Sequence, residues 1–200
     1  YGLSTAIAFT MDPNTILSRV ADAALQQCEA DEVSIMLPMP EGNELYLAVV
    51  RGERPRPILG ERVPVEGTVA GWVVRTHETL TLQGEVRDPR FAPLIPRQEI
   101  RAAISMPMVV GGKLQGVLNV NATDRRRGFR LGQVKALNVL ATIAATALEN
   151  AQLYRQVRER EETLHALYQA GLEIQEPLKL QMRLDRLLQT SREVLQVDRL

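Results

Sequence analysis

The chain has 200 residues, of which 45% are hydrophobic, and its 24 basic and 24 acidic side chains give a formal net charge of zero. That length supports one well-buried core and part of a second, while zero net charge supplies no global field to concentrate nucleic acid or anionic membrane at the surface. Cys28 is the only cysteine, so an internal disulfide, a Cys-rich zinc site and a Cys-x-x-Cys redox pair are excluded, and a reducing compartment is favoured.

The first predicted elements are a helix and a pair of strands. Asp12 and Pro13 predict a helix start, because an aspartate side chain can cap free backbone N–H groups and proline at the first helical position gives up no hydrogen bond. Apolar residues then recur at intervals of three and four up to Cys28, which predicts a helix with Cys28 in the core. Residues 32–37 and 45–50 alternate in polarity, which predicts two strands joined by a turn.

A short helix with two glycines at its head comes next, followed by a strand over residues 79–82. Gly67 and Gly71 are not followed by the Gly-Lys-Ser/Thr sequence of a P-loop or by the third glycine of a dinucleotide-binding motif. The residues that bind phosphate in those loops are therefore missing here. We interpret Gly67 as freeing the backbone at the helix entry and Gly71 as letting the helix lie close to the sheet. The residues predicted to share one face of this helix are Val69, Trp72, Val73 and Thr76.

Residues 104–120 form the clearest hairpin in the sequence. Their apolar residues flank Gly111 and Gly112, and two glycines supply the positive φ that both central positions of a primed turn require. Residues 124–130 then hold four arginines and one aspartate, which we interpret as a solvated connector and not as a nucleic-acid contact.

A single helix is predicted from Leu131 to about Gln175, more than about 60 Å long. Such a helix outreaches a domain of this size, so part of it must pack against something else. After residue 150 we expect a parallel coiled coil with a second copy, the alternative being a solvated helix. The predicted dimer seam contains Leu140, Ile143, Ala147, Asn150, Tyr154, Val157 and Leu164, and the same spacing continues through Glu161, Tyr168 and Gly171.

The end of the chain resembles its beginning. Residues 167–177 align with residues 3–13, and residues 184–198 align with residues 17–31, keeping a Leu, an Arg and a final Asp. The order of these matches predicts a tandem array. Because the chain begins with Tyr1, we interpret it as a fragment of a longer protein. No apolar run approaches the ~20 residues of a membrane helix and no signal peptide is visible, so we expect a cytoplasmic chain without a membrane segment.

The order of elements resembles that of a GAF domain. The residues that carry the resemblance are the stretches GTVAGWVVRTHETLTL, VRDPRF and ISMPMVVGGKLQGVLNV, and a long helix that closes with LEN-AQLY. The resemblance implies an α+β fold: a central antiparallel sheet with the terminal helices on one face and a small-molecule pocket, formed by short helices and loops, on the other. It implies a lead-in over 1–13, a GAF domain over 14–155, a connecting helix over 156–178 and the first helix of a second copy over 179–200.

The pocket implied by the resemblance is lined by residues 65–105. Trp72 and Thr76 on the short helix are candidate ligand contacts, although Trp72 is as well explained by core packing. The remaining candidates are Arg87, Asp88, Arg90 and Phe91, whose alternative interpretation is a capped turn with surface arginines, and Ile104 and Met106 on the next strand.

Several specialised relatives are disfavoured by the residues present. The GAF domains that bind cyclic nucleotides share an Asn-Lys pair followed by Phe and Asp-Glu, whereas this chain has Asn121-Ala122 and Gln133-Val134. Cys28 has no adjacent histidine, which disfavours a bilin chromophore, and His77 is expected at the turn that ends a helix, which disfavours haem ligation. A methionine sulfoxide reductase mechanism needs at least two thiols. The ligand is therefore an unknown small molecule, and no metal site is expected.

Three hypotheses follow. The first is a non-catalytic sensory module that binds a small molecule and signals through its long helix to downstream domains of the same chain, such as a histidine kinase. The second is a structural dimerisation spacer whose pocket is filled by its own side chains, with Met36, Met39, Met106 and Met108 as the plug. The third, an enzyme, is least favoured, because no nucleophile, base and orienting group assemble from these residues.

Overall fold

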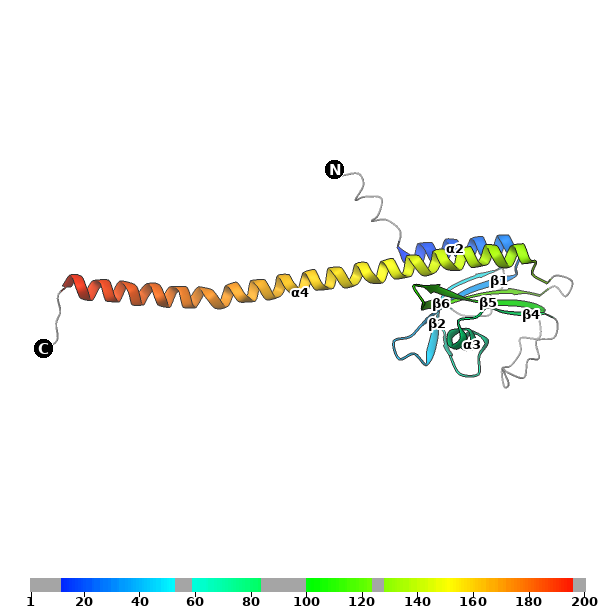
Figure 1. Cartoon of the computed structure of the whole chain (residues 1–200), viewed down its shortest axis with the longest axis horizontal. Coiled ribbons are helices and arrows are strands. Elements are labelled where there is room, and N and C mark those ends of the chain that lie inside the picture. Colours follow the sequence, from blue (N-terminus) through cyan, green and yellow to red (C-terminus); the bar gives the residue numbers. More distant parts are fainter. Residues whose placement is uncertain (1–11, 53–58, 84–99, 124–127, 196–200) are drawn as a thin grey trace, which may run out of the picture. The chain divides into compact units, whose positions relative to one another are not determined.

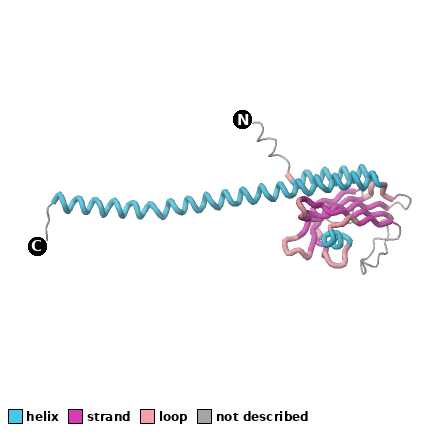
Figure 2. Tube along the Cα trace, viewed as in Figure 1, coloured by secondary structure: helices cyan, strands magenta, loops and turns pink. Residues whose placement is uncertain are grey.

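The computed structural model describes residues 12–52, 59–83, 100–123 and 128–195, with the side chains of 173–179 and 193–195 excepted. The chain divides into two units, residues 1–152 and 153–200. The first unit contains a six-stranded antiparallel sheet, α2 (Pro13–Cys28), α3 (Val69–Thr76) and the first part of α4 (Leu131–Leu195), and Figure 2 distinguishes its strands from its helices. The described part of the second unit, residues 153–195, is the remainder of α4.

The sheet has the strand order β3-β2-β1-β6-β5-β4. Its strands are β1 (Glu32–Pro38), β2 (Glu44–Gly52), β3 (Arg62–Pro64), β4 (Leu80–Gln83), β5 (Ala102–Val110) and β6 (Lys113–Ala122). All of the pairings are antiparallel. The predicted strand pair is confirmed as β1 and β2, and the predicted hairpin as β5 and β6, with φ of 57° at Gly111 and 78° at Gly112. The predicted α+β fold class is therefore confirmed.

The main core lies between the sheet and the two terminal helices. Figure 1 shows α2 and the start of α4 along one face of the sheet and α3 on the other. From α2 the core receives Leu17, Val20, Ala21, Ala24 and Cys28, and from α4 it receives Leu137, Ala141, Ala144, Ala145 and Leu148. Small residues on both helices allow close packing, and the burial of each large aliphatic side chain contributes roughly 1.5–3 kcal/mol. The predicted core position of Cys28 is confirmed, since it is 5% exposed.

The start of α2 differs in detail from the prediction. Asp12 occupies the N-cap position and Pro13 follows it, but the Asp12 side chain makes no hydrogen bond to a helix N–H group. Its carboxylate instead accepts hydrogen bonds from Asn14 Nδ2 at 3.3 Å and Thr15 Oγ1 at 3.4 Å. The backbone carbonyl of Asp12 still accepts the first bonds of the helix, from the N–H groups of Thr15 and Ile16.

Helix α4 is longer than predicted. We expected it to end near Gln175, because proline has no N–H group and its ring clashes with the preceding turn. The helix instead continues through Pro177 to Leu195. One proline removes a single backbone bond, and the leucine, glutamate, lysine and glutamine residues on both sides of it favour helix.

The stretch Leu131–Leu172 of α4 is long and apolar enough, by length and composition alone, to cross a membrane. No membrane helix was predicted here, because polar residues interrupt the stretch and leave no unbroken apolar run of about 20 residues. The core helix of a globular domain passes the same test, and Leu137, Ala141 and Leu148 of this stretch are buried against the sheet and α2. Only 28% of the apolar stretch is buried, so core packing accounts for part of its apolar character.

Candidate functional site

Helix α3 is fixed against its own preceding loop. Gly67 has φ of 72°, which confirms that it frees the backbone at the helix entry. Thr68 is the N-cap residue, and its Oγ1 accepts a hydrogen bond from the Gly71 N–H at 3.0 Å. A Cβ atom on Gly71 would lie 1.6 Å from the Val65 carbonyl oxygen, so the close approach is to the loop and not, as predicted, to the sheet.

A second, smaller apolar cluster joins α3 to the sheet. Its buried members are Leu45, Ala70, Val73, Leu80 and Val117, and Met36, Val65, Val69, Trp72, Val74 and Leu82 pack against it. The buried face of α3 is centred on Ala70 and Val73, whereas Trp72 is only partly buried and Thr76 is exposed. Trp72 therefore borders this cluster, whereas Thr76 is exposed and its hydroxyl donates to the Trp72 carbonyl at 3.0 Å.

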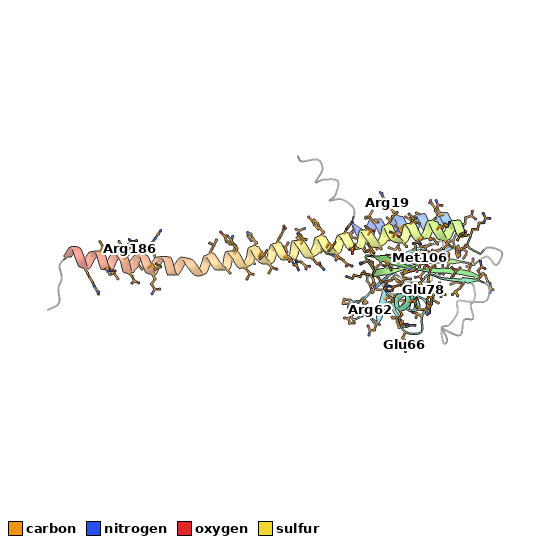
Figure 3. All side chains as sticks on the ribbon, in the orientation of Figure 1. Arg19, Arg62, Glu66, Glu78, Met106 and Arg186 are labelled. Atoms are coloured by element: carbon orange, nitrogen blue, oxygen red, sulfur yellow. The ribbon has the colours of Figure 1, made fainter. Side chains whose placement is uncertain are left out.

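Alternation along the strands decides which side chains face α3. On β5, Ile104, Met106 and Met108 belong to the main core with the terminal helices. Ser105 lies between the first two, so its side chain is on the α3 side, where Leu80 is its pairing partner. Ile104 and Met106 were predicted ligand contacts, and this placement corrects that assignment, because they face the terminal helices (Figure 3 labels Met106).

The α3 side of the sheet carries a row of buried polar side chains, which we call the polar row: Ser34 on β1, Asn119 on β6 and Ser105 on β5. They are direct neighbours across three adjacent strands and are 2%, 8% and 5% exposed. Ser105 Oγ donates to Asn119 Oδ1 at 2.5 Å, and Asn119 Nδ2 donates to Ser34 Oγ at 3.5 Å. Sequence reasoning missed this row, although the alternation of each strand contained the signal.

A second pair extends the polar row toward one end of the two central strands, β1 and β6. Glu32 and Asn121 are pairing partners, two residues before Ser34 and two after Asn119, and Asn121 Nδ2 donates to Glu32 Oε1 at 2.9 Å. Glu32 is 5% exposed. Burying polar groups costs free energy unless they are hydrogen-bonded, and aliphatic side chains would fill a purely structural position at lower cost. The α3 side is thus the face of this sheet with groups suited to recognising a polar molecule.

The other predicted contacts have different outcomes. Arg87, Asp88, Arg90 and Phe91 lie outside the described residues. Among the proposed plug residues, Met36 packs near α3, but Met106 and Met108 lie on the opposite face and cannot fill the same cavity. His77 is the C-cap of α3 with φ of 57°, as its predicted place at the helix end requires.

Among the residues that the structure describes, Cys28 is the titratable group with a clear perturbation. Burial raises the pKa of its thiol to about 11, because desolvation disfavours the thiolate. The thiolate is the nucleophilic form, so this residue is poorly suited to covalent chemistry. Within the described ranges, no group of three or more His, Cys, Asp or Glu side chains is arranged to hold a metal ion.

The predicted dimer residues on α4 divide between the two units. In the first unit, Leu140 and Ala147 are partly buried, Leu140 against the main core, while Ile143 is 48% exposed and Asn150 is exposed. In the second unit, Tyr154, Val157 and Leu164 are all exposed on α4.

These features define an α+β module with terminal helices on one face of an antiparallel sheet and a short helix on the other. The chain belongs to the GAF domain family, whose family model matches residues 12–148.

Solved structures share this fold. The chain is similar to the GAF-B domain of DevS from Mycobacterium smegmatis, with 24% identity over 73% of this chain and 99% of that one and a TM-score of 0.60. It is similar to part of a methyl-accepting chemotaxis protein, with 19% identity, 76% and 97% coverage and a TM-score of 0.64. It is also similar to the free methionine-R-sulfoxide reductase of Neisseria meningitidis, with 21% identity, 75% and 86% coverage and a TM-score of 0.61. At these identities the similarity shows the fold alone.

Proposed function

We propose that this GAF domain is a non-catalytic, cytoplasmic sensory module that binds a small molecule on the α3 side of its sheet. The observation that carries the proposal is the buried polar row of Ser34, Asn119 and Ser105. Three adjacent strands present hydroxyl and carboxamide groups there, and a small number of placed polar groups among apolar walls is typical of ligand sites. Trp72 and Met36 border the same side.

The module passes its signal to a downstream output domain of the same chain through α4, and it works as a homodimer. Two of the similar structures, DevS and the chemotaxis protein, come from proteins whose names are consistent with signalling, and a histidine kinase is one suitable output. Helix α4 starts in the main core, where Leu137, Ala141 and Leu148 pack on the sheet and α2. A ligand that alters the sheet can therefore act on α4 through these packing contacts. Signalling also requires that α4 has two arrangements and that the ligand binds the protein more tightly in one of them.

The similarity to a methionine sulfoxide reductase does not extend to its chemistry here. The chain has a single cysteine, Cys28, which lies on α2 in the core with the terminal helices, on the sheet face opposite α3. Burial also raises the pKa of that thiol to about 11. A thiol in this position meets neither the exposure nor the ionisation that thiol redox catalysis requires.

We also propose that residues 179–200 begin a second copy of the module. The α2 positions that are buried in the main core align with mostly apolar residues of α4 that are exposed. The aligned pairs are Leu17 with Leu184, Val20 with Leu187, and Ala21 with Leu188. Slow amide exchange at 184–188 in the full-length protein would support this assignment, and fast exchange there would contradict it.

The test of ligand binding is native mass spectrometry of the protein purified from its host, compared with its mass after denaturation. A reproducible extra mass per chain, lost on denaturation, is the expected result. The Ser105→Ala variant should lose that mass or bind it at least about tenfold more weakly, since one hydrogen bond to a buried group accounts for about that factor.

Ile104→Val is the matched control, because it changes the adjacent residue of β5 on the opposite face. It should keep the extra mass. A wild-type protein without extra mass would favour the dimerisation spacer. If both variants lose the extra mass equally, reduced stability of the domain, and not the lost Ser105 hydroxyl, would explain the weaker binding.

A further inference from the structure

A β-bulge interrupts the pairing of β6 with β5 at Gln115. Met108 lies opposite Gly116, and the next pair is Val109 with Leu114. Gln115 is therefore an extra residue of β6 with no residue opposite it. Because a bulge can turn a side chain to the other face of the sheet, the face that Gln115 occupies has to be read from its contacts.

The bulge turns the Gln115 side chain toward the terminal helices. Val117 belongs to the smaller apolar cluster with α3, so alternation alone would place Gln115, two residues earlier, on the α3 side as well. Gln115 instead meets α4, where Gln152 Nε2 donates to Gln115 Oε1 at 3.1 Å. Gln115 is 3% exposed, and Gln152 is the last residue of the first unit. A buried carboxamide of the sheet thus contacts α4 at the end of that unit.

The hydrogen bonding of Gln115 is incomplete. We call Gln115 and Gln152 the carboxamide pair. Gln115 Oε1 has its partner within the pair, but Gln115 Nε2 is buried and has no hydrogen-bond partner among the residues that the structure describes. A buried donor without an acceptor costs more free energy than one neutral hydrogen bond contributes. The pair therefore holds α4 weakly, and an arrangement in which the two carboxamides separate and reach water is close to it in free energy.

A second bulge shows that such a position does not require a polar residue. Between β1 and β2 the register shifts after Ile35, and Ala48 is the extra residue of β2. Ala48 also packs against the main core, so both bulges place an extra side chain on the face of the terminal helices. An apolar residue would fill the place of Gln115 without the cost of burying a carboxamide. The polar side chain of Gln115 is thus explained by its contact with α4 and not by the bulge.

The bulge of β6 is also in backbone contact with β1. A Cβ atom on Gly116, the residue after Gln115, would lie 2.6 Å from the Met36 carbonyl oxygen. Met36 and Val117 both pack in the smaller apolar cluster with α3. A change in this cluster that moves either strand therefore acts on the bulge, because backbone atoms cannot rotate out of the way as side chains do. Gln115 thus connects that cluster with α4.

We propose that the carboxamide pair is the contact through which the sheet holds or releases α4. While the pair is formed, the end of α4 in the first unit is held against β6. A movement of β6 at the bulge separates the two carboxamides, and the last turn of α4 before residue 153 then loosens. This inference rests on the proposed function, and it names the contact by which binding on the α3 side alters α4.

The carboxamide pair is tested by amide hydrogen exchange over residues 148–152 of the full chain, because exchange there requires the last turn to open. Gln152→Met removes the hydrogen bond and leaves the whole Gln115 carboxamide buried without a partner, so exchange should be at least about tenfold faster. Gln115→Met removes the same bond together with the unsatisfied donor, so exchange should be slower than in the wild type. Gln156→Met, one turn further on and exposed, is the matched control and should leave exchange unchanged.

A second comparison tests the route from the α3 side. Val117→Ala makes a cavity in the cluster with α3 beside the bulge, and it should change exchange over 148–152 by at least about twofold. In the Gln115→Met background the same substitution should have no such effect. Leu82→Ala, in the same cluster but on the edge strand β4, is the control and should leave exchange over 148–152 unchanged in both backgrounds. If Val117→Ala does not fold, Met36→Ala replaces it.

The outcomes separate this inference from the proposed function. Faster exchange in both Gln115→Met and Gln152→Met would show an ordinary structural hydrogen bond and would overturn the release of α4 at this pair. An equal effect of Val117→Ala with and without Gln115 would overturn the route through the bulge. Neither readout involves a ligand. A protein that carries extra mass but gives one of these results would keep the proposed ligand site and lose this inference, whereas a bare protein with the expected exchange would lose the ligand site alone.

Discussion

Gly71→Ala should destabilise the module even though alanine is the better helix former. In an open helix position this substitution is worth about 1 kcal/mol in favour of alanine. At Gly71 the new Cβ would lie 1.6 Å from the carbonyl oxygen of Val65, 2.4 Å from its carbonyl carbon and 2.8 Å from its Cα. Ordinary contact begins at 3.4 Å, so the helix and the loop would have to separate by about 1.8 Å.

The displaced atoms are backbone, which cannot rotate away as a flexible side chain would. Overpacking of this kind costs about 1–3 kcal/mol and occasionally more. A separation of that size would also disturb the bond from the Gly71 N–H to Thr68 Oγ1, because Thr68 lies in the same loop. We expect a net loss of about 1–3 kcal/mol after the helix-propensity gain is subtracted, which corresponds to roughly 2–12 °C in the unfolding midpoint.

Gly132→Ala is the matched control. Gly132 also lies in a helix, but a Cβ atom there would meet nothing within 4 Å. That substitution should stabilise the protein by up to about 1 kcal/mol. Urea and thermal unfolding of both variants, followed by circular dichroism, provide the measurement. If Gly71→Ala is as stable as Gly132→Ala, the close approach of α3 to the Val65 loop is wrong, and with it the position of α3 on the sheet.

Three further predictions concern single side chains. Ser105→Ala should cost about 1–3 kcal/mol by leaving Asn119 Oδ1 buried without its donor, and Asn119→Leu added to it should recover part of that loss in urea unfolding. Cys28 should resist a thiol reagent at pH 8 until the protein unfolds. Burial raises the pKa of this thiol to about 11 from an ordinary value of 9.0. Its contribution to the free energy of unfolding is therefore complete below pH 9 and falls between pH 9 and 11. A Cys28→Ala variant whose free energy of unfolding falls equally over that pH range would refute this. Asn150→Leu should tighten the dimer or change its stoichiometry in ultracentrifugation, and an unchanged dimer would remove Asn150 from the seam.

The elements of this protein were readable from local pattern because each depends on neighbours along the chain. The alternation over 32–37 and 45–50 predicted β1 and β2, and Gly111 and Gly112 predicted the hairpin of β5 and β6. Each pattern reports how a segment fits a pleat or a helical turn, and that geometry needs no partner from elsewhere in the chain.

The candidate site was less predictable, for a physical reason. Alternation shows that Ile104 and Ser105 point to opposite sides of β5, but it does not show which side meets the terminal helices and which meets α3. The apolar character of Ile104 and Met106 suits either side. Their position in the main core, and the position of Ser105 beside Asn119, were decided when α2 and α4 packed on one face.

The sequence by itself determined the described helices and every described strand except β3, which lies in the proline-rich stretch 51–64 that was predicted to hold no regular element. It also determined the turn glycines, the buried place of Cys28 and the lack of a second thiol, because these depend on composition and local spacing. Only the tertiary structure decided that Ser34, Asn119 and Ser105 meet in one row across three strands, since the residues are far apart in the chain and register alone brings them together. The tertiary structure also decided that Leu140 packs against the main core while Val139 is exposed to solvent. Which face of a helix is exposed depends on which face packs against the rest of the domain.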